Sequence, residues 1–266
     1  MAITTQDGLI AARGAKRQGF TFARTSISNM AAGQLASLYR AAGGPPAQPA
    51  VPGAAVVPDK TLTFNFNNKT GSDTTYIDRF GGVGGASGVL MLYDRLFHIG
   101  GLNGTLTTAQ TVNSQSVLTW PARGGLAKAE ESEWFLEWYT DTGATAVTAT
   151  VAVTYTDTTT GTISVALAAT MRAGRLLPIS PPQGKYIASV QSVTLSATTG
   201  TAGSFGATCG DRYADATLYL PAANIGAPSL EALMNQVGDN ACLWMVVQCT
   251  GTSTGDVRGE FSLIQG

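Results

Sequence analysis

Hydrophobic and polar residues alternate along residues 131–169, and this alternation predicts three consecutive β-strands. In a helix the apolar residues would recur every three or four positions, which does not happen here. The pattern is broken by Asp, Thr and Gly at Asp141–Gly143 and Asp157–Gly161, which predicts turns. We expect an antiparallel meander with one face buried and a threonine-lined face exposed to solvent or to a partner. Its strands are expected at 131–139, 145–155 and 163–167.

The first of these strands carries tryptophans on one side and glutamates on the other. Two carboxylates on one side of a strand could serve a glycosidase, and exposed tryptophans could stack on sugars. Alternation alone explains both sets: the tryptophans share their face with a leucine and fit a core, and the glutamates fit a solvated face. The apolar set is Trp134, Leu136 and Trp138, and the acidic residues here are Glu130, Glu131, Glu133 and Glu137.

The pattern near the N-terminus changes to helical spacing. The apolar pair Leu9 and Ile10 indicates a short helical turn between Thr5 and Arg13, before Gly14. A longer helix is expected over about residues 29–42. Its apolar stripe would be Leu35, Leu38, Tyr39 and Ala42, with Ser28 or Asn29 as the N-cap and Gly43 as its end.

Residues 43–58 consist largely of Gly, Pro and Ala, which is typical of a semi-rigid extended linker. We therefore expect a boundary between an N-terminal arm, residues 1–60, and a β domain, residues 61–266. Within the latter, Leu243–Val247 is apolar on both faces, which predicts a central buried strand. The expected fold is mainly β, an antiparallel β-sandwich or jelly roll, with an N-terminal arm that contains one helix.

The composition is low in charge and rich in glycine. Charged residues make up only 12% of the 266 residues, and Gly occurs 32 times. Such a surface suits either a protein covered by neighbours or a β-rich extracellular module. The arm carries six basic and two acidic side chains, a net charge of +4 against −5 for the remainder, and so could dock on an acidic surface. The predicted interface residues are Arg13, Lys16, Arg17, Phe20, Phe22, Arg24, Leu35, Leu38, Tyr39 and Arg40.

Catalytic and metal-binding patterns are sparse. His98 is the only histidine and is interpreted as a packing and hydrogen-bonding residue, although Asp94 and Arg95 are near it in sequence. The spacing of Cys209, Cys242 and Cys249 does not fit a zinc site, and three free thiols are expected. The glycine run at 81–85 is expected to be a flexible loop, and it lacks the Lys-Ser/Thr of a phosphate-binding loop. We expect no enzyme activity, cofactor, metal or specific nucleic acid.

The chain shows no secretory signal and no apolar run long enough to span a membrane, so assembly in a reducing cytoplasm without membrane contact is expected. Four stretches carry a resemblance to a known group of proteins: Ile3–Ala12, Leu35–Gly43, Leu92–Asn113 and Ser189–Gly206. Through these stretches the chain resembles virion structural proteins of tailed bacteriophages. The segment from Pro178 to Pro182 is longer and richer in proline than in that group.

The resemblance implies a particle component in the virion and carries over no catalytic residue. We expect a capsid decoration or cement protein that binds the major capsid protein or other virion proteins through its arm, as a homo-oligomer with a trimer favoured. Two alternatives stay open. One is a neck or tail structural protein, and the other is a carbohydrate-binding receptor module of a fibre or spike. Exposed aromatic side chains would favour the receptor module, whereas buried tryptophans would favour a shell protein.

Overall fold

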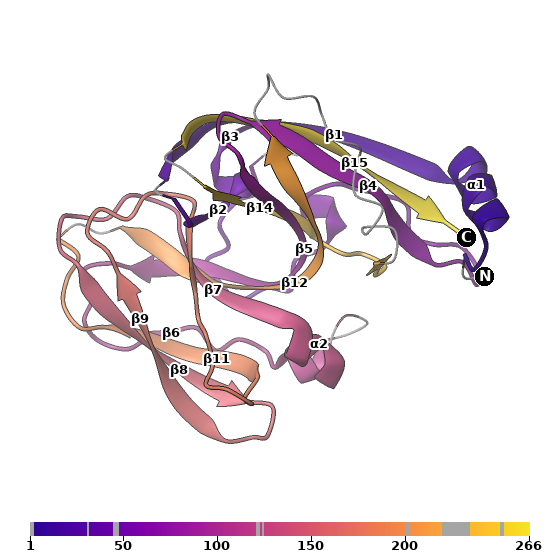
Figure 1. Ribbon diagram of the computed structural model, residues 1–266. Helices are drawn as coiled ribbons and strands as arrows, with labels where there is room; N and C mark the ends of the chain where they lie inside the picture. Colours follow the sequence, from indigo (N-terminus) through magenta and orange to yellow (C-terminus); the bar gives the residue numbers. More distant parts are fainter. Residues whose placement is uncertain are drawn as a thin grey trace.

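The computed structural model describes residues 3–30, 32–44, 48–120, 123, 125–200, 203–219, 235–250 and 253–266. It confirms a mainly β fold of antiparallel sheets with a helix near the N-terminus. Figure 1 shows a small sheet packed against one end of a larger, strongly curved sheet. The larger sheet contains β1 (Arg17–Met30), β2 (Leu35–Ser37), β3 (Ala42–Gly44), β4 (Thr75–Gly84), β5 (Gly88–Asn103), β7 (Ser132–Trp138), β10 (Arg175–Pro178), β12 (Ser204–Tyr219), β13 (Gln236–Val237), β14 (Leu243–Cys249) and β15 (Ser253–Gln265).

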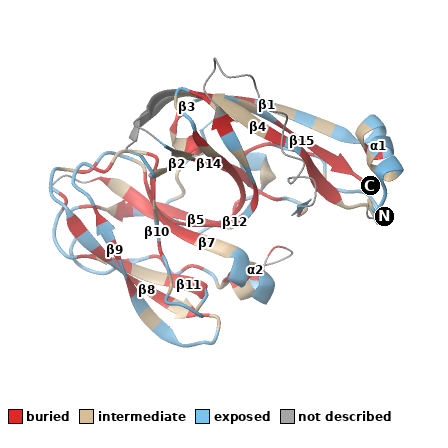
Figure 2. Ribbon diagram, viewed as in Figure 1, coloured by how far each residue is buried: buried red, intermediate tan, exposed pale blue. Residues whose placement is uncertain are grey.

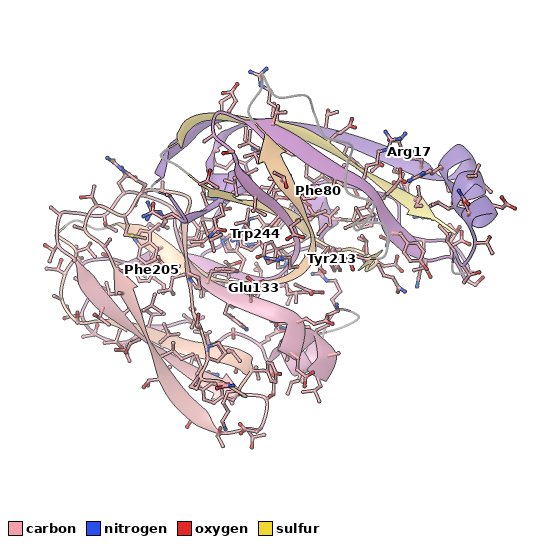
Figure 3. All side chains as sticks on the ribbon, viewed as in Figure 1. Arg17, Phe80, Glu133, Phe205, Tyr213 and Trp244 are labelled. Atoms are coloured by element: carbon pink, nitrogen blue, oxygen red, sulfur yellow. The ribbon has the colours of Figure 1, made fainter. Side chains whose placement is uncertain are left out.

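Six strands of the larger sheet close on themselves in the order β5, β14, β2, β10, β7 and β12, and we call this closed set the ring. Closure is possible because β12 pairs antiparallel with both β5 and β7. The inside of the ring is filled by an aromatic-rich cluster, in which Tyr93 lies 5.4 Å from Trp244 and 6.2 Å from Phe135 between ring centroids. Trp244 is labelled in Figure 3. As predicted from its two apolar faces, β14 is a buried strand, paired on both sides.

The remaining strands extend the sheet away from the ring. The end of β12 pairs in parallel with β4, which is followed by β15, β1 and β3. Helix α1 (Gln6–Ala15) lies at the far end of this extension, beside both chain termini (Figure 1). Thr5 caps α1 by accepting a hydrogen bond from the N–H of Gly8, so the short N-terminal helix predicted from Leu9 and Ile10 is confirmed.

The small sheet packs face to face on the ring and makes the sandwich. Its strands lie in the order β6 (Gln110–Thr111), β11 (Ile187–Leu195), β8 (Val147–Tyr155) and β9 (Thr160–Leu167). Valines on its inner face, among them Val151 and Val193, meet Trp134, Trp138 and Phe205 from the ring in one core. The outer face is exposed, as the alternating colours of β8 in Figure 2 show. Short helices are η1 (Leu38–Arg40), η2 (Lys60–Leu62), η3 (Val117–Thr119) and α2 (Leu126–Glu131).

The meander predicted over 131–169 is correct for its second and third strands. β8 and β9 form an antiparallel hairpin whose Thr148 and Thr150 face outward, while Val147 and Ala149 are buried. The first strand, β7, belongs to the ring instead and does not pair with β8. Because β7 has the small sheet on one side and the inside of the ring on the other, both of its faces are buried. The solvated face predicted for Glu137 is therefore wrong, since Glu137 is fully buried.

The helix predicted over 29–42 is also wrong. Within the described residues of this segment, the chain forms the end of β1, then β2, η1 and the start of β3. The apolar residues that suggest a helical stripe lie in two separate cores, with Leu38 in the core of the extension and Tyr39 inside the ring. Helical spacing arises here because the chain turns sharply at η1, which sends neighbouring side chains to opposite cores. The glycine run at 81–85, expected to be a loop, falls largely in β4.

The segment predicted as an arm is part of the larger sheet. β1 pairs with β15 from Arg17↔Ile264 to Met30↔Ser253, and β2 closes the ring between β14 and β10. Residues 48–59 are extended, as the linker composition predicts, and residues 45–47 lie outside the described chain. Instead of separating two bodies, this stretch crosses one end of the ring, where Val56 and His98 exchange two backbone hydrogen bonds of 3.0 Å.

Candidate functional site

A cluster of charged side chains lies buried at the end of the ring. Arg95 and His98 come from β5, Glu137 from β7 and Arg40 from η1. Arg95 donates Nη2 to Oε2 of Glu137 and Nε to the hydroxyl of Thr208, at 2.8 Å for the latter. Nε of Arg40 lies 3.7 Å from Oε1 of the same glutamate. One carboxylate therefore faces two guanidinium groups in an environment without solvent.

A β-bulge explains why Arg95 and His98 point to the same side of β5. Opposite β12, Phe97 pairs with Cys209 and Arg95 pairs with Gly210, so β5 has one extra residue, Leu96, at this point. An extra residue reverses the alternation of side chains in a strand. Phe97 consequently faces the small sheet, whereas Arg95 and His98 both face the ionic cluster. Regular alternation would have placed them on opposite faces.

His98 is held in its neutral form. Its Nε2 lies 2.8 Å from the hydroxyl of Tyr139 and 3.6 Å from Oε2 of Glu137. Burial lowers the pKa of His98 well below its usual range, and the positive charges of Arg95 and Arg40 lower it further. These contacts confirm the interpretation of His98 as a packing and hydrogen-bonding residue. With His98 neutral, the cluster has one positive charge in excess.

A second ionic group fastens the loops on the opposite side of β5. Oδ1 of Asp94 accepts hydrogen bonds from Nη1 of Arg123 at 2.6 Å and from the backbone N–H of Cys242 at 2.8 Å. The hydroxyl of Tyr213 donates to Oδ2 at 3.3 Å, and Arg123 also donates to the carbonyl of Pro58. The group thus ties β5, β12 and the start of β14 to the stretch before η2.

Asp94 makes the stability of the fold sensitive to pH. Burial raises the pKa of Asp94 to about 6, and Arg123 opposes the rise. Between about pH 4 and pH 6 the folded protein then retains a proton that the unfolded chain has released, so stability falls as pH rises through this window, by about 3 kcal/mol for this group. We expect the Tm of the wild type to fall relative to that of Asp94→Asn from pH 4 to pH 6, in thermal unfolding. Parallel pH profiles for the two proteins would contradict this.

The residues predicted as an arm interface are largely committed to internal contacts. Arg13 and Arg17 both approach Asp78, at 2.5 and 3.5 Å, and Lys16 pairs with Asp73. Phe20 stacks on Phe261 at 4.9 Å between centroids. Buried in the fold are Phe22, Arg24, Leu38 and Tyr39, whereas Leu35 is half-buried and Arg40 joins the ionic cluster. Docking through the buried side chains would require the sheet to open, whereas Lys16 and Arg17 are exposed and Arg13 is partly exposed. The use of these residues as a partner interface stays a prediction.

Two of the three cysteines are buried as free thiols, as predicted. Cys209 and Cys242 are free and buried, and the side chain of Cys249 lies outside the described residues. Burial raises the pKa of Cys242 to about 12 and that of Cys209 well above its usual range. Across the described ranges, no group of three or more His, Cys, Asp or Glu side chains is placed to hold a metal ion.

Sequence reasoning missed the pairing of Arg95 with Glu137, which are far apart in the chain. The available signal was that Phe135, two residues before Glu137, interrupted the expected polar face of its strand.

In the part of the chain that the structure describes, no helix is long and apolar enough to cross a membrane. Comparison of the chain with protein-family models, with curated proteins and with solved structures gives no significant match.

Proposed function

We propose that this chain is a non-enzymatic structural component of a tailed-phage particle, acting as a capsid decoration or cement protein in the virion. The resemblance of the sequence to virion structural proteins of tailed phages supports this class of protein. The observation that supports a protein-contact role is the outer face of the β8–β9 hairpin, which is exposed and uncharged. We call it the threonine face: Thr148, Thr150, Ala152, Thr154, Thr160, Thr162, Ser164 and Ala166.

The edge of the hairpin supports the same role. β9 lies at the edge of the small sheet, and its partner among the described strands is β8. Exposed edge strands are usually protected by charges, proline or a bulge, but β9, with the sequence TGTISVAL, has none of these. A neighbouring protein that covers the hairpin would provide hydrogen-bond partners for the backbone groups of this edge. We propose a homo-oligomer, with a trimer favoured, in which the threonine face and the β9 edge contact another copy or the major capsid protein.

The alternative of a carbohydrate-binding receptor module has weaker support. All four tryptophans of the chain, Trp120, Trp134, Trp138 and Trp244, are buried, so none can stack on a sugar. Tyr186 is 40% exposed and lines a cavity of about 180 Å³ together with Glu133. If the chain binds a glycan, this cavity is the expected site. The second alternative, a neck or tail protein, differs from a shell protein in copy number.

The test combines copy number with variants of the threonine face. We expect many copies on the head shell in a particle reconstruction. The double variant Thr150→Lys, Thr162→Lys should fold but be largely lost from particles, because it places two charges on the contact face. Thr107→Lys, at an exposed loop position, is the matched control and should bind normally. About six or twelve copies per particle would indicate the neck or tail, and normal binding of the double variant would exclude the threonine face.

A further inference from the structure

A cavity of about 340 Å³ lies between the buried ionic cluster and the stretch at residues 49–63, which is extended up to residue 59 and then forms η2. This stretch is fixed over the end of the ring by hydrogen bonds, including Gly100 N–H to the carbonyl of Pro52 at 2.8 Å and Arg40 Nη2 to that of Pro49 at 2.7 Å. At Gly100 a Cβ atom would lie 2.1 Å from the side chain of Val51, so the stretch approaches β5 as closely as glycine allows. The cavity therefore has a defined roof.

Two buried hydroxyl groups on the wall of the cavity lack partners. Tyr39 is fully buried and Thr63 is 9% exposed, and within the described residues neither hydroxyl makes a hydrogen bond. Burial raises the pKa of Tyr39, and the Thr63 hydroxyl, which lies close to Tyr39 and to the thiol of Cys242, opposes that rise. Burying a hydroxyl without a partner is unfavourable. The pair therefore has hydrogen-bonding capacity on this wall that a polar group in the cavity could use.

The same wall carries an excess of positive charge. Arg95 lines the cavity with His98, and its Nε and Nη2 are used by Thr208 and Glu137. A guanidinium group carries five N–H donors, so Arg95 has donors beyond these two. Because two guanidinium groups share one carboxylate, an anionic group at this wall would be attracted. The carboxylate of Asp59 also borders the cavity, but it is exposed at the rim and accepts hydrogen bonds from Thr61.

The opposite wall is apolar. It is formed by side chains of the extended stretch, including Pro52, Val57 and Pro58. Two apolar residues that line the cavity are exposed, Val56 at 36% and Leu62 at 48%. Apolar walls with a few convergent polar groups are the usual composition of small-molecule sites, which begin at about 300 Å³.

We propose that this cavity binds a small monocarboxylate with a short aliphatic body. The carboxylate is held by Arg95 and by the hydroxyls of Tyr39 and Thr63, and the body lies against Val57 and the prolines. This ligand supplies acceptors for both hydroxyls and also neutralises the excess charge, which water cannot do.

The first experiment titrates the purified full-length protein with hexanoate, 1-hexanol and hexylammonium, which share one aliphatic chain and differ in the charge of the head. We expect saturable binding of hexanoate with a rise in Tm, weaker binding of hexanol and none of hexylammonium. A cavity that holds only water would give no saturable binding of hexanoate, and equal binding of hexylammonium would contradict the assigned charge. Either result would overturn the proposal. No particle is needed, so failure here leaves the proposed function untouched.

Variants then locate the site. Tyr39→Phe with Thr63→Val should weaken hexanoate binding by about tenfold or more, because both removed hydroxyls donate to a charged acceptor. Ala50→Phe keeps the interior intact and should abolish binding, since Ala50 is exposed where it lines the cavity and the larger side chain fills it. Thr107→Val, in a loop outside the cavity lining, is the control and should bind as the wild type does. Wild-type affinity in Ala50→Phe would refute the location even if the double variant did not fold.

Discussion

Replacing Glu137 with Gln lowers the free energy of unfolding by about 3–5 kcal/mol, the range found when one partner of a buried ion pair is removed. Glu137 is fully buried and is the carboxylate shared by Arg95 and Arg40. The amide keeps the shape of the side chain but leaves two buried guanidinium groups without a counter-charge. Urea denaturation of the two proteins at pH 7 measures the loss.

Two further variants separate the charge from the shape. Glu131→Gln, at a glutamate that is 60% exposed beside Lys128, should change the free energy of unfolding by less than about 1 kcal/mol. In the Glu137→Gln background, Arg40→Met should restore part of the loss, because it removes one of the two unpaired cations. A loss for Glu137→Gln no larger than that for Glu131→Gln would show that the buried cluster contributes little to stability.

The local pattern of hydrophobic and polar residues predicts individual strands better than it predicts how six of them close into the ring. The alternation in 145–155 and 163–167 predicts β8 and β9 because one face of that hairpin is solvated, and the apolar run at Leu243–Val247 predicts β14. The sheet to which β7 belongs could not be predicted in this way, because both faces of the strand are buried and its pattern does not distinguish the two sheets. Glutamate on such a strand suggests solvent, whereas Glu137 is accommodated by arginines that come from β5 and η1.

The candidate site was hidden for a related reason. The bulge at Leu96 reverses the side-chain alternation of β5. Asp94, Arg95 and His98 lie in that strand without regular alternation, so the sequence does not show which of them share a face. Composition correctly indicated that residues 48–59 are extended. It could not show that they cross the ring rather than leave it, because that depends on Gly100 and on backbone hydrogen bonds with β5.

Removing residues 1–32 abolishes cooperative folding, whereas removing residues 1–15 does not. The longer deletion takes away β1, which pairs with β15 along most of its length and contributes Phe22 to a buried core. β15 then keeps β4 on one side but loses β1 on the other, β3 loses its pairing with β1, and Phe261 loses its stacking on Phe20. Circular dichroism during heating should show a sharp transition for the full chain and none for the 33–266 fragment.

The 16–266 fragment is the matched control for this deletion. Helix α1 buries few side chains, among them Ala12 against Tyr76 and Ile264. Its deletion removes the ion pair between Arg13 and Asp78, but Arg17 is retained and still lies near the same carboxylate. We therefore expect a lowered Tm with cooperativity retained. A cooperative transition in the 33–266 fragment would mean that the rest of the sheet is stable without β1 and that the segment can detach, which is the condition under which an N-terminal arm could dock on a neighbouring subunit.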